Sequence, residues 1–121
     1  MDGIHHLALR VRDCDVAAGF YSSVFGLAEM RRIEDEGRLR AVWFRLGASV
    51  LMLERSLLGK GYEKGSAHVL AFPAQNLDEA EEKLSKLGIP VTARTPNTLY
   101  FQDPDGHRLA LSTYSFSETT L

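Results

Sequence analysis

The sequence has very little cysteine and no long apolar segment. Among its 121 residues Cys14 is the only cysteine, so no disulfide can form within the chain. The longest apolar runs, such as residues 48–53, are far shorter than the ~20 residues that a membrane-spanning helix needs. Residues 1–6 lack the basic and apolar regions of a signal peptide. We therefore expect a cytoplasmic protein with no membrane partner.

An excess of one charge is also lacking. The chain has 14 Lys and Arg against 16 Asp and Glu, which gives a formal net charge of −2 and no electrostatic reason to expect nucleic acid as a partner. Hydrophobic residues make up 45% of the chain, and there are only 4 prolines, which excludes disordered and low-complexity classes. At this length we expect one domain, residues 1–121.

The first half of the chain predicts a strand, a helix and three strands. Apolar and polar residues alternate over 3–12, as in a strand with one apolar face. Asp13 offers a helix N-cap, and Gly26 is suited to the left-handed turn that ends a helix. Between them, apolar residues recur at helical spacing at Val16, Phe20 and Val24. Three further strand-like runs follow at 29–33, 40–46 and 49–53.

The second half predicts the same order of elements. An apolar strand over 67–74 precedes Asn76, which starts an Asn-x-x-Glu capping box with Glu79, and the helix ends before Gly88. Three short strands follow at 90–94, 98–102 and 108–113. We therefore predict an α+β fold of two βαβββ modules, about 3–57 and 66–114, that form a curved, cup-shaped mixed sheet with the helices outside.

An equal separation of matching residues supports an internal duplication. His6 precedes His68 by 62 positions, and Gly26 precedes Gly88 by 62 as well. A module of about sixty residues buries too little surface to be stable alone, so we expect the two to share one sheet.

Several motifs carry a resemblance to a known family. They are HLALRV at 6–11, Phe20-Tyr21 followed by VFGL at 24–27, AHVLAF at 67–72 and YFQDPDGHRL at 100–109. Together they resemble the vicinal oxygen chelate superfamily, the group of glyoxalases, bleomycin-resistance proteins and dioxygenases. The resemblance implies paired βαβββ modules around a cupped sheet, a small-molecule ligand or substrate, and a homodimer.

The resemblance also implies where a metal would bind. Metal-dependent members take one ligand from the first strand and one from the last strand of each module, and the first-strand histidines match His6 and His68. The last-strand glutamate positions fall at Met52 and Ala110, so both carboxylates are missing. Glu54 lies roughly 7 Å further along the strand than Met52 and would reach the same ion only through a bulge or a water. Two alternatives stay open: cavity-lining histidines with no metal, or a weakly bound divalent ion such as Zn, Ni, Mn or Fe.

Strand alternation anchored on His6 and His68 predicts which side chains line the cup. Apolar walls with a few polar groups are typical of a small-molecule site. Trp43 suits stacking on a planar ligand, but a large aromatic residue equally fills a core or a dimer interface. The expected ligand-binding residues are Arg10, Trp43, Arg45, Met52, Glu54, Leu70, Phe72, Tyr100, Gln102 and Arg108.

Two functions follow from these residues. One is a protein similar to bleomycin-resistance proteins, which binds a planar or aromatic organic ligand in the cup without a full metal site. The alternative is a divalent-metal-dependent lyase, isomerase or dioxygenase that uses His6 and His68. The family's glyoxalase I and fosfomycin-resistance enzymes are disfavoured, since Ala110 stands where the latter keep a glutamate and Ala8 where they keep a threonine. No catalytic residue is assigned.

Overall fold

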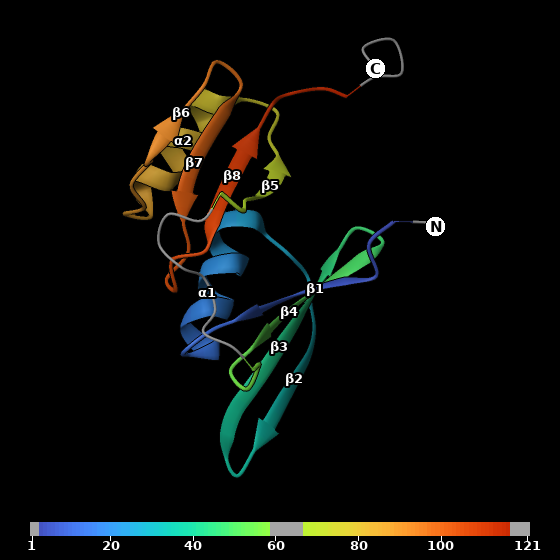
Figure 1. Ribbon diagram of the computed structural model, residues 1–121. Coiled ribbons are helices and arrows are strands. Elements are labelled where there is room, and N and C mark those ends of the chain that lie inside the picture. Colours follow the sequence, from blue (N-terminus) through green and yellow to red (C-terminus); the bar gives the residue numbers. More distant parts are fainter. Residues whose placement is uncertain (1–2, 59–66, 117–121) are drawn as a thin grey trace. The chain divides into compact units, whose positions relative to one another are not determined.

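The computed structural model describes residues 3–58 and 67–116, and the chain forms two compact units (Figure 1). The first unit is residues 1–66 together with the turn 104–106, and the second is 67–103 with 107–121. Each unit contains one predicted βαβββ module, so the α+β fold class is confirmed. The predicted module start at residue 66 lies outside the described residues. That both units form one domain stays a prediction.

The first unit is a four-stranded mixed sheet with one helix. Its strands stand in the order β1-β4-β3-β2; β1 runs parallel to β4, and the other neighbours are antiparallel. The alternating pattern of the first strand and the turns at Gly37 and Gly47 account for this arrangement, because both glycines have the positive φ that tight hairpin turns require. The elements are β1 (His6–Arg10), α1 (Cys14–Phe25), β2 (Glu29–Asp35), β3 (Arg38–Leu46) and β4 (Ser49–Glu54).

Helix α1 covers one face of this sheet. The covered face is built from Val42, Phe44, Leu51 and Leu53, all fully buried. The helix contributes Cys14, Ala17, Ala18, Tyr21 and Val24. The predicted stripe was therefore partly wrong: Val24 is buried, but Val16 is 55% exposed. The small side chains of Ala17 and Ala18 let the helix approach the sheet closely. The helix therefore turns these alanines to the sheet and leaves the larger Val16 side chain exposed.

The second unit repeats the arrangement with shorter strands. Strand order is β5-β8-β7-β6, again with the first and last strands parallel. Leu84 of the helix is fully buried. It packs on the face that carries Leu99, Phe101, Leu109 and Leu111. The elements are β5 (Leu70–Pro73), α2 (Leu77–Lys86), β6 (Ala93–Arg94), β7 (Thr98–Gln102) and β8 (Arg108–Ser112).

Both helices begin and end at the predicted residues. The Asp13 carboxylate accepts hydrogen bonds from the backbone N–H groups of Asp15 and Val16, at 2.9 and 3.1 Å. Asn76 caps α2 in the same way, since its side-chain oxygen accepts from the Glu79 N–H at 3.1 Å. Gly26 and Gly88 have φ of 63° and 74°, the left-handed conformation that glycine adopts without steric cost.

The turn between β7 and β8 is fixed at both of its ends. The backbone N–H of Asp103 donates to the His107 carbonyl at 3.0 Å, and the Asp103 carboxylate accepts from the His107 N–H at 2.8 Å. At its tip, Asp105 accepts hydrogen bonds from the backbone N–H and from Nε of Arg12, at 2.9 and 3.1 Å. Residues 104–106 therefore belong to the first unit although they connect two strands of the second.

Candidate functional site

The open face of the first unit is the sheet face opposite α1, and strand register orders its residues in three rows. His6, Val50 and Arg45 are register partners in one row, and Arg10, Glu54 and Ala41 form another. The middle row is Ala8, Met52, Trp43 and Arg31. All the residues that the sequence predicted for the cup in this half therefore lie on one face.

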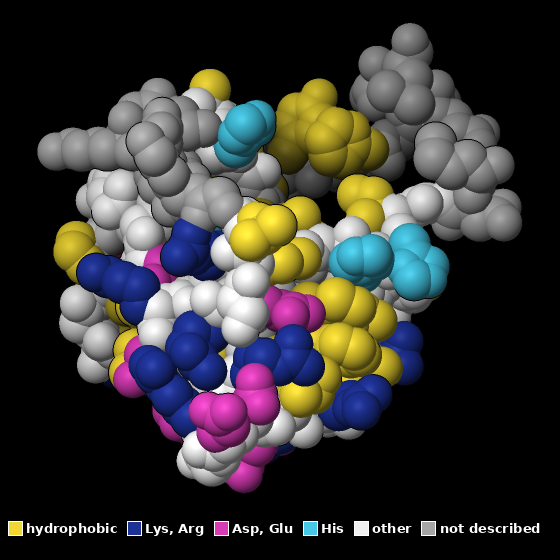
Figure 2. Space-filling model, turned by 60° about the horizontal axis from the view of Figure 1, so that its bottom comes forward, with side chains coloured by type: hydrophobic (Ala, Val, Ile, Leu, Met, Phe, Trp, Pro, Cys, Tyr) yellow, Lys and Arg dark blue, Asp and Glu magenta, His cyan; other side chains and the backbone are white. Residues whose placement is uncertain are grey.

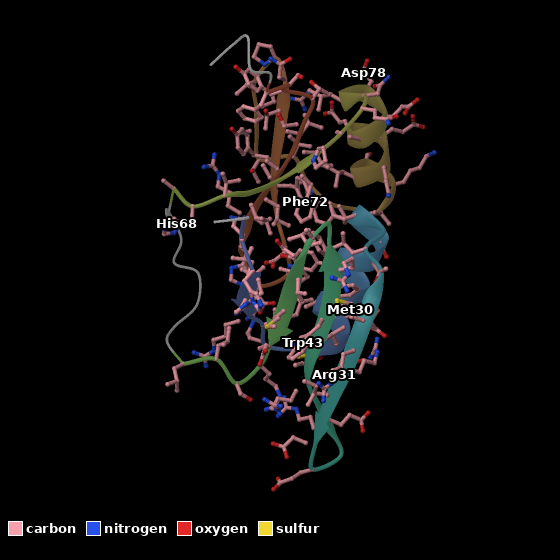
Figure 3. The ribbon with its side chains drawn as sticks, turned by 90° about the vertical axis from the view of Figure 1, so that its right-hand side faces the viewer. Met30, Arg31, Trp43, His68, Phe72 and Asp78 are labelled. Atoms are coloured by element: carbon pink, nitrogen blue, oxygen red, sulfur yellow. The ribbon has the colours of Figure 1, made fainter. Side chains whose placement is uncertain are left out.

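Trp43 is the centre of this open face. The indole is half-buried, and its Nε1–H donates a hydrogen bond to Glu54 Oε2 at 3.3 Å. The guanidinium carbon of Arg31 lies 5.4 Å from the centre of the ring, a cation–π distance. Figure 3 shows Trp43 and Arg31 close together on the sheet. The indole thus has a carboxylate at its N–H edge and a guanidinium over one face of the ring.

His6 begins this open face and is exposed to solvent. Its Nδ1 lies 2.8 Å from Nδ1 of the neighbouring His5, so one ring donates a proton and the other accepts it. Histidine side chains reach the molecular surface in Figure 2. His6 is thus oriented by the residue that immediately precedes its strand.

The open face of the second unit contains a hollow of about 630 Å³. This volume lies within the range of ~300–1,000 Å³ that is usual for small-molecule sites. Tyr100 stands in its wall, and the guanidinium carbon of Arg108 lies 4.4 Å from the centre of the Tyr100 ring. The residues that line the hollow are Val69, Ala71, Phe72, Pro73, Thr95, Asn97, Thr98, Tyr100, Ala110, Ser112, Tyr114 and Phe116.

The register of β5 corrects the predicted face of this strand by one residue. Ala71 is the partner of Ala110, while Leu70 and Phe72 are the partners of Leu109 and Leu111. Leu70 and Phe72 therefore share the face that packs under α2, and their predicted place on the cup face was wrong. The strand, and with it the regular alternation of side chains between the two faces, starts only at Leu70. Counting from His68 therefore assigned Leu70 and Phe72 to the open face instead of the face under α2. Phe72 is 8% exposed and still contributes to the wall of the hollow.

The structural counterpart of His6 in the second unit is Val69. Ala8 and Ala71 occupy the same register position, beside Met52 and Ala110 respectively, and are 63 positions apart. The N-caps Asp13 and Asn76 are also 63 apart. Counting back two residues from Ala8 and from Ala71 pairs His6 with Val69, which lines the hollow, whereas His68 is not among the lining residues. The separation of 62 that pointed to His68 holds for Gly26 and Gly88, whereas these strand and N-cap positions are 63 apart.

The side chains at the metal positions do not fit a full divalent-metal site. By register these positions hold His6 and Met52 in the first unit and Ala110 in the second, and Val69, two residues before Ala71, lines the hollow beside Ala110. One imidazole and one thioether remain, whereas zinc and similar ions are usually held by three or four N, O or S ligands. Within residues 3–58 and 67–116, no three His, Cys, Asp or Glu side chains are grouped so that they could hold an ion. The predicted approach of His6 to His68 involves both units and stays a prediction.

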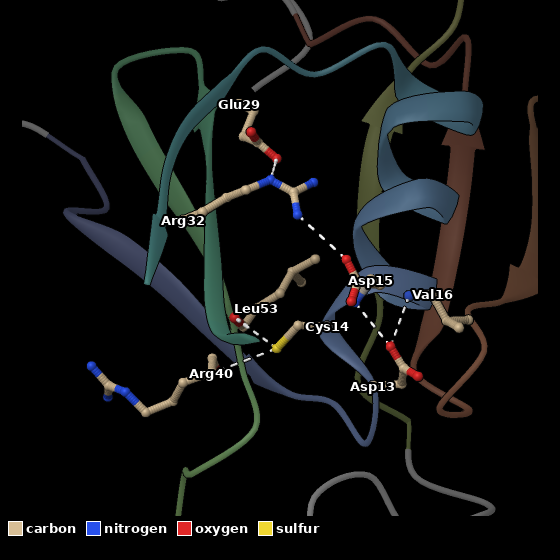
Figure 4. Close-up of polar contacts among 8 residues, drawn as sticks. All are labelled: Asp13, Cys14, Asp15, Val16, Glu29, Arg32, Arg40 and Leu53. Carbon is tan, nitrogen blue, oxygen red and sulfur yellow. Dashed lines mark hydrogen bonds and ion pairs between the residues drawn. The ribbon is translucent and has the colours of Figure 1, made fainter. Parts of the chain in front are cut away.

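Polar side chains behind the open face of the first unit stabilise the fold. Cys14 is buried, its Sγ lies 3.2 Å from the Arg40 carbonyl oxygen, and burial raises the pKa of its thiol (Figure 4). Arg32 bridges Glu29 and Asp15, with N···O distances of 2.9 and 3.4 Å. The hydrogen bond that Arg32 donates to the Glu29 carboxylate raises the pKa of Arg32. A buried thiol that stays protonated is a poor nucleophile.

Comparisons with known proteins give the family context. Residues 3–111 match the Glyoxalase/Bleomycin resistance protein/Dioxygenase superfamily. The chain is 29% identical over 123 residues to metallothiol transferase FosB from Bacillus licheniformis, covering 93% of this chain and 76% of that protein.

Within the described part of the chain, no helix is both long and apolar enough to cross a membrane.

Solved structures share the fold at low identity. The fosfomycin resistance protein FosX from Mesorhizobium loti superposes with a TM-score of 0.81 at 24% identity, covering 99% of this chain and 98% of that one. A FosX mutant from Listeria monocytogenes, complexed with Mn(II) and 1S,2S-dihydroxypropylphosphonic acid, gives 0.80 at 21% identity, covering 100% and 99%. The chain is thus similar to fosfomycin resistance proteins, although the sequence disfavoured an enzyme of that group. The reason for that expectation still holds, because positions 8 and 110 are alanine in this chain.

Proposed function

Because the chain belongs to the Glyoxalase/Bleomycin resistance protein/Dioxygenase superfamily, we propose that it binds a small planar organic ligand on the open faces of its sheets, without a full metal site. The observation that carries the proposal is the Trp43 position. A half-buried indole lies on the sheet face away from α1, with Glu54 at its N–H edge and Arg31 over one face, and the ring face that Arg31 does not cover could stack on a flat ligand.

The polar groups around Trp43 would orient such a ligand. Glu54 accepts from the indole through Oε2, and its carboxylate has further acceptor capacity for a donor group on the ligand. Arg45 and Arg10 lie in the flanking rows and are exposed. A ligand would therefore be stacked on the ring and fixed at its edges by charged side chains.

The alternative is a divalent-metal-dependent lyase, isomerase or dioxygenase that uses His6 and His68. The Mn(II) complex of a FosX protein supports metal use among structural relatives. Against it stand Met52, Val69 and Ala110, which cannot replace carboxylate and imidazole ligands. We therefore propose no catalytic step that depends on a metal. A homodimer and a cytoplasmic location remain part of the proposal.

Fluorescence of the sole tryptophan tests the proposal directly. We expect planar aromatic compounds, titrated into protein treated with EDTA, to quench Trp43 saturably, and added Mn²⁺ or Zn²⁺ to leave the affinity unchanged. Calorimetry should show that Trp43→Leu loses this binding, whereas Phe20→Leu, an aromatic change on α1, retains it. Binding that appears only after a divalent metal is added would instead support the metal-dependent enzyme.

A further inference from the structure

Among the residues that the structure describes, none that lines the hollow of the second unit is charged. Its described lining residues include aliphatic, aromatic, hydroxyl and amide side chains but no Lys, Arg, His, Asp or Glu. Ala71 and Ala110 are register partners in its floor, and their small side chains leave room above the sheet. The apolar floor and the missing charges together favour a ligand that is itself uncharged.

Polar groups in the lining gather around Ser112. The Ser112 hydroxyl lies 2.9 Å from Thr98 Oγ1 and donates to the Asn97 carbonyl at 3.2 Å. It also accepts from the Tyr114 N–H at 3.1 Å. These groups fix one another, but the side-chain amide of Asn97 makes no hydrogen bond to any described residue. Asn97 therefore offers a ligand both a donor and an acceptor.

Arg108 is a cation close to the hollow, but it is not among the lining residues. It is the register partner of Gln102, whereas the hollow lies on the other side of Tyr100, towards Thr98. Its guanidinium lies over the Tyr100 ring, so Arg108 makes a cation–π contact with this ring rather than an ion pair with a ligand in the hollow. An anion in the hollow would lose water without gaining an ion pair, which is unfavourable.

Two aromatic side chains extend the lining beyond the sheet. Tyr114 and Phe116 are 56% and 80% exposed, and their rings pack edge to face at 4.9 Å. A ring-bearing ligand in the hollow would cover part of this exposed apolar surface, which favours binding.

We propose that this hollow binds an uncharged, ring-bearing molecule whose hydrogen-bonding groups meet Asn97, and that it discriminates against anions such as phosphonates. This inference rests on the proposed function and names the ligand class of one of its open faces. It differs from the phosphonate ligand found in the FosX complex, as the uncharged lining requires.

The test uses two probes with one ring system and different charge. 7-Methoxycoumarin is neutral, and coumarin-3-carboxylate is an anion at neutral pH. In two-dimensional NMR spectra of the full chain, we expect the neutral probe at millimolar concentration to shift the amide resonances of Ala71, Asn97 and Ala110. The carboxylate should shift them at least severalfold more weakly.

Variants at the exposed position Asn97 test the cause of this preference. Asn97→Lys introduces a cation and should reverse it in favour of the carboxylate. Ser85→Lys adds the same charge on α2 and should leave the preference unchanged. A neutral preference that persists in Asn97→Lys would overturn the role given to the lining.

The remaining outcomes separate this inference from the proposed function. If the carboxylate binds the unchanged hollow as tightly as the neutral probe, the inference fails and ligand binding stands. If the probes shift only resonances around Trp43, the inference again fails alone. If neither probe shifts any resonance, both proposals fail.

Discussion

Val69 and Ala110 show that single side chains determine whether a sheet face can bind a metal ion. Both line the hollow, and both stand at positions where metal-dependent relatives are expected to carry ligands. Neither a valine nor an alanine side chain offers a donor atom to a metal ion. His68, one residue away, is not among the lining residues.

Restoring the donors should restore metal binding. We expect Val69→His combined with Ala110→Glu to raise the affinity for Ni²⁺ or Zn²⁺ by on the order of tenfold or more, since an imidazole and a carboxylate would then share one face. Calorimetric titration of the double variant and the unchanged protein measures this. The single variant Ala110→Glu is the control; if it binds as tightly as the double variant, His68 supplies the second ligand and the register argument is wrong.

At the scale of whole elements, the helix caps show how local chemistry sets boundaries. Asp13 accepts two N–H groups of the first turn of α1, and Asn76 accepts one in α2. The free N–H groups of a helix start otherwise have no partner within the helix. Two short polar side chains thus determine where both helices begin.

The cap of α1 contributes measurably to stability. Asp13→Ala should lower the free energy of unfolding by about 1 kcal/mol, because two backbone donors lose their acceptor. Urea denaturation followed by circular dichroism gives the difference. Asp13→Asn keeps an acceptor oxygen and is expected to remain within a few tenths of a kcal/mol. A loss equal to that of alanine would show that charge, not capping, matters here.

The same local signals explain what the sequence could predict. Asn76 and the glycines at 26 and 88 act on their own neighbours, so helices and their ends were readable. The face of β5 was not, because alternation cannot be counted through the irregular residues before Leu70. The hollow was predicted only in part. Tyr100 and Phe72 were expected to bind a ligand and line it, but Asn97 and Phe116 lie outside regular strands, and only tertiary packing brings them beside Ala110. The only sequence signal for this part of the hollow was the pair of aromatic residues at 114 and 116.

At the scale of the molecule, unpaired strand edges favour association. Each four-stranded sheet ends in two strands with a neighbour on one side only, β1 and β2 in the first unit and β5 and β6 in the second. Taken for each sheet by itself and for the described residues, such edges carry backbone donors and acceptors that can pair with another strand. We therefore expect a homodimer with two-fold symmetry, as most homo-oligomers have. Sedimentation equilibrium at micromolar concentration should give twice the chain mass, and a single-chain mass would remove the dimer.

The turn at 104–106 has a consequence for how this chain can evolve. A gene built by duplication is often assumed to recombine by exchanging whole repeats. Here residues 104–106, which connect two strands of the second unit, belong to the first unit. Within them, Asp105 accepts hydrogen bonds from the backbone N–H and from the side chain of Arg12. A transplanted second repeat that lacked this aspartate would leave the Arg12 N–H without its acceptor. One carboxylate therefore links the two modules, and a chain assembled from modules of different origin would keep this link only where both Arg12 and Asp105 are present.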